Sequence, residues 1–247
     1  MSRKQNIDQL LRQWQYDPET LNVRQVRGDD GRDVIQMRID MGVLQMELEG
    51  RPDGTRPHGY ETYYDFLLGQ EFRDVEFQLT EEQCSEADRE FVQFYHRRIC
   101  WLALREFPRA VADADHSLAL MDFCGEHSPD ENWTISHEQY RPFVLFHRTQ
   151  AAALAQLEKQ SPDEAVQEIN VGLERLQEVF EQYDAEDSFD DNELVERLQE
   201  LRESVRDHFQ LGRTLHERLA DAVAAEQYEL AAEIRDELAR RTSSSRR

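Results

Sequence analysis

The sequence has no excess of basic residues and no long apolar run. Its 247 residues include 29 Lys and Arg against 52 Asp and Glu, which gives a formal net charge of -23. Nonspecific affinity for nucleic acid depends on basic side chains that neutralise phosphates, so this balance argues against direct nucleic-acid binding. No run of about eighteen apolar residues occurs, so we expect no membrane-spanning helix. Residues 1–20 lack an apolar core of signal-peptide length, which predicts a cytoplasmic protein.

Cysteine is scarce, and the metal and catalytic motifs that can be read from sequence are absent. Cys84, Cys100 and Cys124 form no CxxC pair, and their odd number does not suggest a disulfide framework. The apolar neighbours of Cys100 indicate a buried thiol. The eight histidines form no HExxH motif. We therefore expect a protein that is not an enzyme and that has no catalytic residues, no metal site and no cofactor.

One helical segment is the nearest candidate for a metal site. Asp113, Asp115 and His116 lie close together in sequence, but residues two apart on a helix point away from each other. We interpret the three as a solvated helix face.

The N-terminal region, residues 1–80, is predicted to be small and α+β. A short helix at 6–16 ends before Pro18, and residues 22–27 and 34–40 flank a glycine turn. Alternating apolar residues continue after Gly42 in a shifted phase, which fits a bulge or tight turn. We therefore predict a three-stranded antiparallel β-meander. A helix over 34–49 is the competing interpretation.

Two Arg-Pro-x-Gly turns follow, at residues 51–54 and 56–59. Each has a proline with a preset φ and a glycine free to take a positive φ. They are interpreted as a connection to the next helix, although an arginine on a rigid loop could also bind an anion or an acidic partner segment. The tyrosine-rich stretch 60–67 is predicted to form a helix that covers the sheet.

Residues 81–180 are predicted to be helical and partly resemble tetratricopeptide repeats. The residues placed as in the second helix of that repeat are Phe107, Ala110, Ala114, Ser117 and Leu118, and in a second partial copy Ala165, Ile169, Gly172 and Leu173. Arg97 and Arg98 depart from the family pattern, which has an apolar and a small residue there. Ala110 and Ala165 are 55 residues apart. That spacing exceeds the ~34-residue period, so 123–140 should be an insertion. We expect a compact pair of helical hairpins.

The acidic run at 181–193 is predicted to be a solvated linker and the best domain boundary. A long helix should follow. Leu194, Leu198, Leu201 and Val205 lie at heptad spacing, and the same register passes through His208 and Gly212. These last two residues argue against a continuous coiled coil and predict a flexible joint near Gly212.

The most specific pattern is at residues 215–238, which predict two short amphipathic helices folded back on each other. Apolar and small residues share one face of each helix: Leu215, Leu219 and Ala222 in the first, and Leu230, Ala231, Ile234 and Leu238 in the second. Small side chains at Ala231 and Ala232 permit close helix packing. The turn is expected at 226–228.

This hairpin resembles the UVR motif, first recognised in the B and C subunits of the bacterial nucleotide-excision repair nuclease. The matching residues are Tyr228-Glu229, Ala231-Ala232 and Ile234-Arg235-Asp236. The resemblance implies a docking module that pairs with another such hairpin, on a partner or on a second copy, and that has no catalytic residues. The partner-binding residues expected from it are Leu219, Tyr228, Glu229, Ala231, Ala232, Ile234, Arg235, Asp236 and Leu238.

Together these patterns predict a mostly α-helical α+β protein. Its expected parts are 1–80, the helical region 81–180, the linker 181–193, a long helix with the hairpin at 194–240, and a disordered tail at 241–247. The favoured function is a non-catalytic adaptor that docks partners through the hairpin.

Two other functions remain open. One is an accessory factor of nucleotide-excision repair that engages a repair subunit. The other is an enzyme with a charged site in the N-terminal part, where the candidate residues are Arg38, Asp40, Arg51, Asp53, Arg56 and His58.

Overall fold

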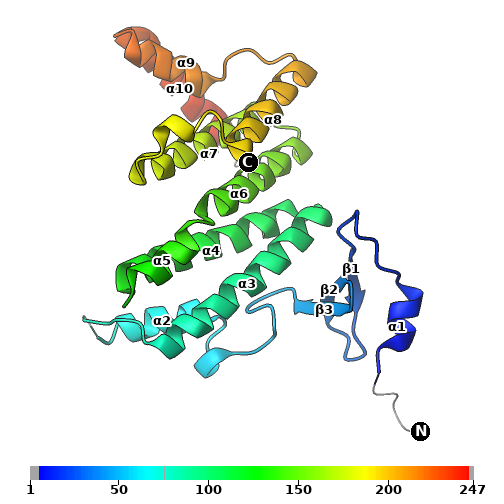
Figure 1. Ribbon diagram of the computed structural model, residues 1–247. Coiled ribbons are helices and arrows are strands. Elements are labelled where there is room, and N and C mark those ends of the chain that lie inside the picture. The colour runs from blue at the N-terminus through cyan, green and yellow to red at the C-terminus, as the bar shows by residue number, and fades with distance from the viewer. Residues whose placement is uncertain (1–5, 75, 245–247) are drawn as a thin grey trace. The chain divides into compact units, whose positions relative to one another are not determined.

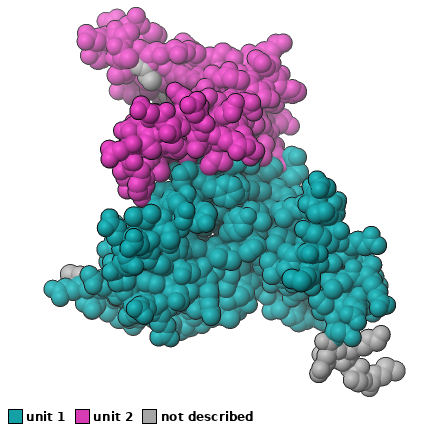
Figure 2. All heavy atoms as spheres, in the orientation of Figure 1, with its two compact units in different colours: residues 1–151 teal, residues 152–247 magenta. Residues whose placement is uncertain are grey.

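The computed structural model describes residues 6–74 and 76–244, without the side chains of residues 220, 238, 239 and 241–244. A three-stranded sheet near the N-terminus is followed by helices along the rest of the described chain (Figure 1). This confirms the mostly α-helical α+β class. The chain divides into two compact units, residues 1–151 and 152–247 (Figure 2). Among the described residues, no helix is both long and apolar enough to cross a membrane.

The sheet is the predicted antiparallel meander, in the order β1-β2-β3. After the short helix α1 (Asp8–Gln13), the strands are β1 (Val23–Arg27), β2 (Asp33–Ile39) and β3 (Gly42–Glu47). Ile39 pairs with Gly42, so residues 40 and 41 form a tight turn. The alternative of a helix over 34–49 is therefore wrong. Ile35 and Met37 are buried on one face of β2 and Val34 on the other, because successive side chains of a strand point to opposite faces.

Helix α2 (Tyr63–Glu71) follows the 3-10 turn η1 (Pro57–Gly59) and packs on other helices. Its buried residues Tyr63 and Leu67 join a core cluster with residues of α3 (Glu81–Ala103) and α4 (Phe107–His127). The prediction that this segment covers the sheet is therefore wrong. The buried carboxylate of Glu90 on α3 accepts the backbone N–H groups of Tyr63 at 2.7 Å and Tyr64 at 3.0 Å. These bonds fix the N-terminus of α2 against α3, where the helix dipole favours negative charge.

Helices α3 and α4 form a hairpin with two arginines in its interior. Arg97 is only 4% exposed and binds Asp113 through two nitrogens, at 2.9 and 2.7 Å. His116 stacks on Phe94 with ring centroids 3.7 Å apart and contacts Glu90 at 3.0 Å. The interpretation of Asp113 and His116 as a solvated face is therefore wrong. Asp113 compensates the buried charge of Arg97, and His116 packs on Phe94 and contacts the buried Glu90 carboxylate.

Among the described residues, five helices are followed by a non-glycine residue in the left-handed conformation. These residues are Arg105, Gln160, Asp184, Gln210 and Glu226, with φ between 51 and 61°. After each one, the next N–H bonds back to a carbonyl in the last helical turn, as Ser161 does to Gln156 at 3.0 Å. The turns at Arg105 and Gln160 are 55 residues apart, and each precedes a helix with proline in its first turn. The two partial repeats thus share the same helix connection.

The insertion at 123–140 contains the short helix α5 (Glu131–Glu138), after which α6 (Arg141–Glu158) begins. The division between the two units falls within α6. It therefore does not coincide with the predicted boundary at 181–193. That acidic run contains the 3-10 turn η2 (Glu186–Ser188) and connects α7 (Pro162–Gln182) to α8 (Glu193–Phe209) inside the second unit. Helices α7 and α8 pack against each other through apolar faces that include Leu176 and Leu198.

The predicted break in the long helix lies at residues 210–214, around Gly212, between α8 and α9 (Leu215–Ala224). The final helix, α10 (Tyr228–Ser244), includes the first four residues of the predicted disordered tail. This part of the chain contains arginines and no glycine or proline, so its composition permits the helix to continue. Residues 245–247 lie outside the described residues.

Candidate functional site: the C-terminal hairpin

The hairpin begins with a complete N-terminal cap. The Thr214 hydroxyl accepts the N–H of Glu217 at 3.2 Å, and the Glu217 carboxylate accepts the N–H of Thr214 at 2.7 Å. This capping box pairs two N–H groups that have no partner within the helix. The first helix of the hairpin therefore starts at Leu215, as the sequence pattern predicts.

The turn of the hairpin lies at residues 225–227. Gln227 donates its N–H to the carbonyl of Ala222 at 2.7 Å, and Glu226 donates to Val223 at 3.0 Å. These two bonds define a Schellman motif, in which Glu226 occupies the position that usually holds glycine. The turn thus begins one residue before the predicted one, and Tyr228 is the first residue of α10.

The hairpin has a small core of its own. Ala222, Ala231 and Ile234 are buried, and Leu215 and Leu219 pack against them. Ala231 is 7% exposed at the helix contact, which confirms that small side chains there allow close packing. Because so few apolar side chains form this core, each contributes a large share of the stability of the hairpin.

Apolar side chains on either side of the turn remain outside this core. Val223 is 51% exposed, Tyr228 68% and Leu230 39%. We call these three residues the hairpin tip. Arg235 and Asp236 are also exposed, and their side chains form an ion pair at 3.5 Å. An exposed pair of this kind contributes little to stability, so both charges are accessible to a partner.

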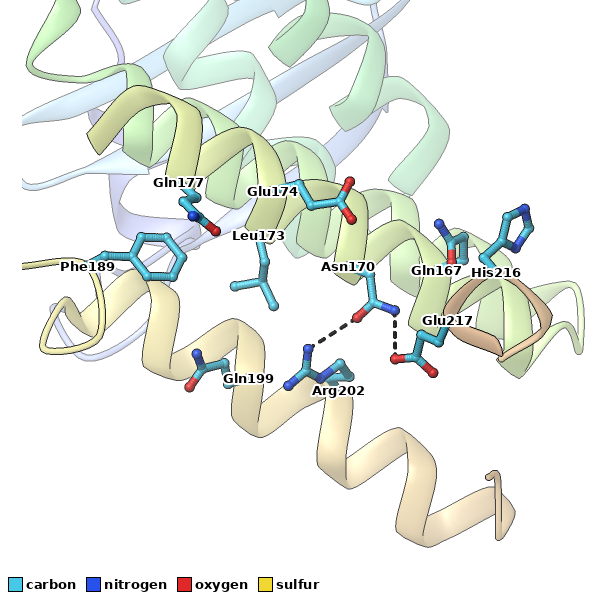
Figure 3. Close-up of a pocket in the computed structure, with 10 residues that line it drawn as sticks. All are labelled: Gln167, Asn170, Leu173, Glu174, Gln177, Phe189, Gln199, Arg202, His216 and Glu217. Atoms are coloured by element: carbon cyan, nitrogen blue, oxygen red, sulfur yellow. Dashed lines mark hydrogen bonds between the residues drawn. The ribbon is translucent and has the colours of Figure 1, made fainter. Parts of the chain in front are cut away.

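The opposite end of the hairpin is bound to α7 and α8. The carboxylate of Glu217 accepts a hydrogen bond from Asn170 on α7 at 3.1 Å and pairs with Arg206 on α8. Asn170 in turn accepts a bond from Arg202 at 3.2 Å, so its side chain bridges α8 and α9 (Figure 3). The hairpin is therefore held at its first turn, while the described residues provide no such anchor for its tip.

A pocket of about 330 Å³ lies at this anchor. Side chains from α7, α8, α9 and the connection before α8 surround it (Figure 3): Gln167, Asn170, Leu173, Glu174, Gln177, Phe189, Gln199, Arg202, His216 and Glu217. Burial raises the pKa of Glu217, but hydrogen bonds from Thr214 and Asn170 and the charge of Arg206 outweigh it and lower that pKa below its ordinary value. Glu217 is thus held as a carboxylate that joins three helices.

The structure places the predicted partner-binding residues in different environments. Tyr228, Glu229, Arg235 and Asp236 are exposed. Ala231 and Ile234 are buried in the hairpin core, and Leu219 and Ala232 are half-buried. Ile234, expected to bind a partner, is instead buried because it packs against the other helix of the hairpin. The Leu238 side chain lies outside the described ones.

Two tip residues were missing from the sequence prediction. The helical spacing places Leu230 on the apolar face and gives Val223 no role. Val223 follows Ala222 directly, and neighbouring residues on a helix point about 100° apart. In a core as narrow as this one, that rotation places Val223 outside the stripe that buries Ala222.

Residues 213–240 match the family model of the UvrB/uvrC motif. The match covers the capping box, α9, the turn and most of α10, which confirms the resemblance found in the sequence. Motifs of this family generally mediate protein–protein interaction and are associated with the UvrABC repair proteins. No curated protein and no solved structure matches the chain.

Arg51 and Asp53 form an ion pair at 3.7 Å, but the three candidate arginines of the N-terminal part have different partners. Arg51 is buried and pairs with Glu86 at 2.6 Å and with Glu90 at 3.4 Å, whereas Arg56 is exposed and pairs with Glu61. Arg38 donates to backbone carbonyls, including that of Trp14 at 2.9 Å. These arginines therefore act in local structure. Gly54 and Gly59, with φ of 76 and 88°, give the two Arg-Pro-x-Gly turns their predicted conformation.

The thiols and possible metal ligands offer no further candidate in the described part of the chain. All three cysteines are buried and free. Burial raises the pKa of Cys100 to about 12, so this thiol is protonated near neutral pH. No group of three or more His, Cys, Asp or Glu among the described residues could hold a metal ion.

Proposed function

We propose that this protein is a non-catalytic adaptor that docks another protein through its C-terminal hairpin. The partner would present a similar apolar helical hairpin, carried by a different protein or by a second copy of this chain. The observation that carries the proposal is the hairpin tip: Val223, Tyr228 and Leu230 are exposed beside a motif whose family pairs helical hairpins.

The arrangement supports docking in two ways. Exposed apolar side chains grouped at one end of a helical hairpin can enter an apolar groove, and a tyrosine is a frequent anchor at such interfaces. The Glu217 network holds the other end of the hairpin, so less conformational freedom would be lost on binding. Arg235 and Asp236 would select the partner and its register through charge pairing.

The test replaces the tip without unfolding the hairpin. In a Tyr228→Asp/Leu230→Glu double variant, both new carboxylates lie in the first turn of α10, where the helix dipole favours negative charge. Ile234→Ala would not serve, because it removes a core residue. Phe72→Asp is the matched control, since Phe72 is 93% exposed and lies far along the chain from the hairpin.

Two measurements follow. Sedimentation velocity of the purified wild type and both variants would detect self-association. Affinity capture followed by reconstitution from purified proteins would detect a different partner. We expect binding by the wild type and Phe72→Asp, and loss in the double variant. Unchanged association and an unchanged set of captured proteins in the double variant would refute the docking role.

The family match favours one specific alternative. The chain could be an accessory factor of nucleotide-excision repair that engages UvrB or UvrC, without contacting DNA itself. Reconstituted binding to either subunit that the double variant loses would support this function. Binding of only unrelated proteins, or of a second copy, would exclude it.

A further inference from the structure

A second cavity lies in the first unit. Its volume is about 720 Å³, and α3, α4, α5 and the start of α6 surround it. Its wall is mostly apolar and aromatic, and includes Phe91, Tyr95, Met121, Tyr140, Phe143 and Val144. Pockets for small molecules typically have roughly 300–1,000 Å³ and walls of this kind with a few polar groups.

Arg98 lines this cavity and is only 2% exposed. Its Nη1 donates to the Ser117 hydroxyl at 3.1 Å, and its Nε reaches His147 Nδ1 at 3.4 Å. In the described part of the chain, no carboxylate forms an ion pair with Arg98. This contrasts with Arg97, whose guanidinium is bound by Asp113. Burial lowers the pKa of Arg98 to about 10, although the charge of Asp113 acts against this. A buried guanidinium without a counter-ion of its own is costly unless an anion reaches it.

The neighbouring groups leave this positive charge poorly compensated. Burial and the charge of Arg98 lower the pKa of His147 to about 4, so the imidazole is neutral near pH 7 and can accept from Arg98. The acidic group in the wall, Asp88, is already bound by His137 at 2.8 Å and by the Trp133 indole at 3.0 Å. The cavity therefore combines one available cation with an apolar wall.

We propose that this cavity binds a small amphipathic carboxylate, whose anionic group pairs with Arg98 and whose apolar body lies against the aromatic wall. A carboxylate matches the planar fork of a guanidinium. A single buried cation balances one negative charge, so a dianion such as a phosphate monoester would keep an uncompensated charge in an apolar site. A cationic ligand would be repelled.

The test compares three ligands that share one apolar body. Full-length protein is titrated by calorimetry with octanoate, 1-octanol and octylammonium. We expect one-to-one binding of octanoate, at least about tenfold tighter than 1-octanol, since a hydrogen bond to a charged group contributes that much. Octylammonium should bind more weakly than either. No octanoate binding, or equal affinities for the three ligands, overturns the proposal.

Variants then locate the site. Arg98→Met should reduce the affinity for octanoate to that for 1-octanol, while the affinity for 1-octanol changes little. Circular dichroism of this variant checks the fold. Unchanged octanoate affinity in folded Arg98→Met overturns the assignment.

A rim position gives a test that does not disturb the core. Val92 lines the cavity and is 55% exposed, so it can accept a charge. Val92→Lys should strengthen octanoate binding and Val92→Asp should weaken it, each by about threefold, through the nearby charge. The same changes at Met41, which is 89% exposed at the tip of the β2–β3 turn, are the control and should have no effect. Equal effects at both positions, or none at Val92, would place the ligand elsewhere.

Discussion

The substitution Ile234→Ala tests whether the hairpin folds around its own small core. The Ile234 side chain is 3% exposed and packs with Ala222 and Ala231. Ile234→Ala removes three carbon atoms, which corresponds to about 2.4 kcal/mol at ~0.8 kcal/mol each, and the cavity left behind adds to the loss. A shallow two-helix core can partly collapse, so we expect about 2–3 kcal/mol. This loss should fall on the hairpin alone, because it is a separate cluster.

Amide hydrogen exchange followed by mass spectrometry measures this loss locally. Amides of residues 215–240 exchange when the hairpin opens. A destabilisation of 2–3 kcal/mol would make this exchange roughly 30- to 150-fold faster. Peptides from α3 and α4 should exchange as in the wild type. Leu230→Ala is the control, since Leu230 is 39% exposed and the same three carbon atoms should cost only about 1.5 kcal/mol there. Unchanged hairpin exchange, or equal acceleration in α3 and α4, would refute the separate core.

Three further predictions concern stability. Asp113→Asn should lower the free energy of unfolding by about 3 kcal/mol, because Arg97 would lose the charge that compensates it; an unchanged melting temperature would contradict this. Glu226→Gly should stabilise the hairpin by about 1 kcal/mol, because glycine adopts positive φ without strain, and slower exchange at residues 222–230 would show it. The folded pKa of Glu217 lies below 4.5, so its stabilisation is complete above about pH 4.5 and is lost as the pH falls through the lowered pKa. In Glu217→Gln, the amide hydrogen exchange of α9 should no longer show this loss of protection at acid pH. A pH dependence of α9 exchange equal to that of the wild type would argue against the Glu217 network.

The hairpin could be predicted from sequence because its signals are local. Leu219, Ala231 and Ile234 recur at helical spacing, and Thr214 precedes Glu217 at the spacing of a capping box. Such patterns depend only on residues within a few turns of each other. Which apolar side chains would be buried was harder to predict. Two short helices can bury only one narrow stripe each, and the crossing of the helices selects that stripe.

The buried arginines could be noticed in the sequence but not explained by it. Arg97 and Arg98 stood out as departures from the pattern of the partial repeat. Their partners, Asp113 and Ser117, come from the next helix, and His147 is 49 positions away from Arg98. Sequence alone could not show that one arginine is paired with a carboxylate while its neighbour faces a cavity without one.

The sequence by itself determined the helices, the β-meander and the C-terminal motif, because period, caps and turn residues act over short distances. Only the tertiary structure decided that α2 packs on α3 and α4 instead of the sheet, and that the acidic run 181–193 connects two packed helices. It also decided which tip residues remain exposed and where Arg98 lies. These outcomes depend on contacts between residues far apart in the chain, and composition and local spacing do not encode them.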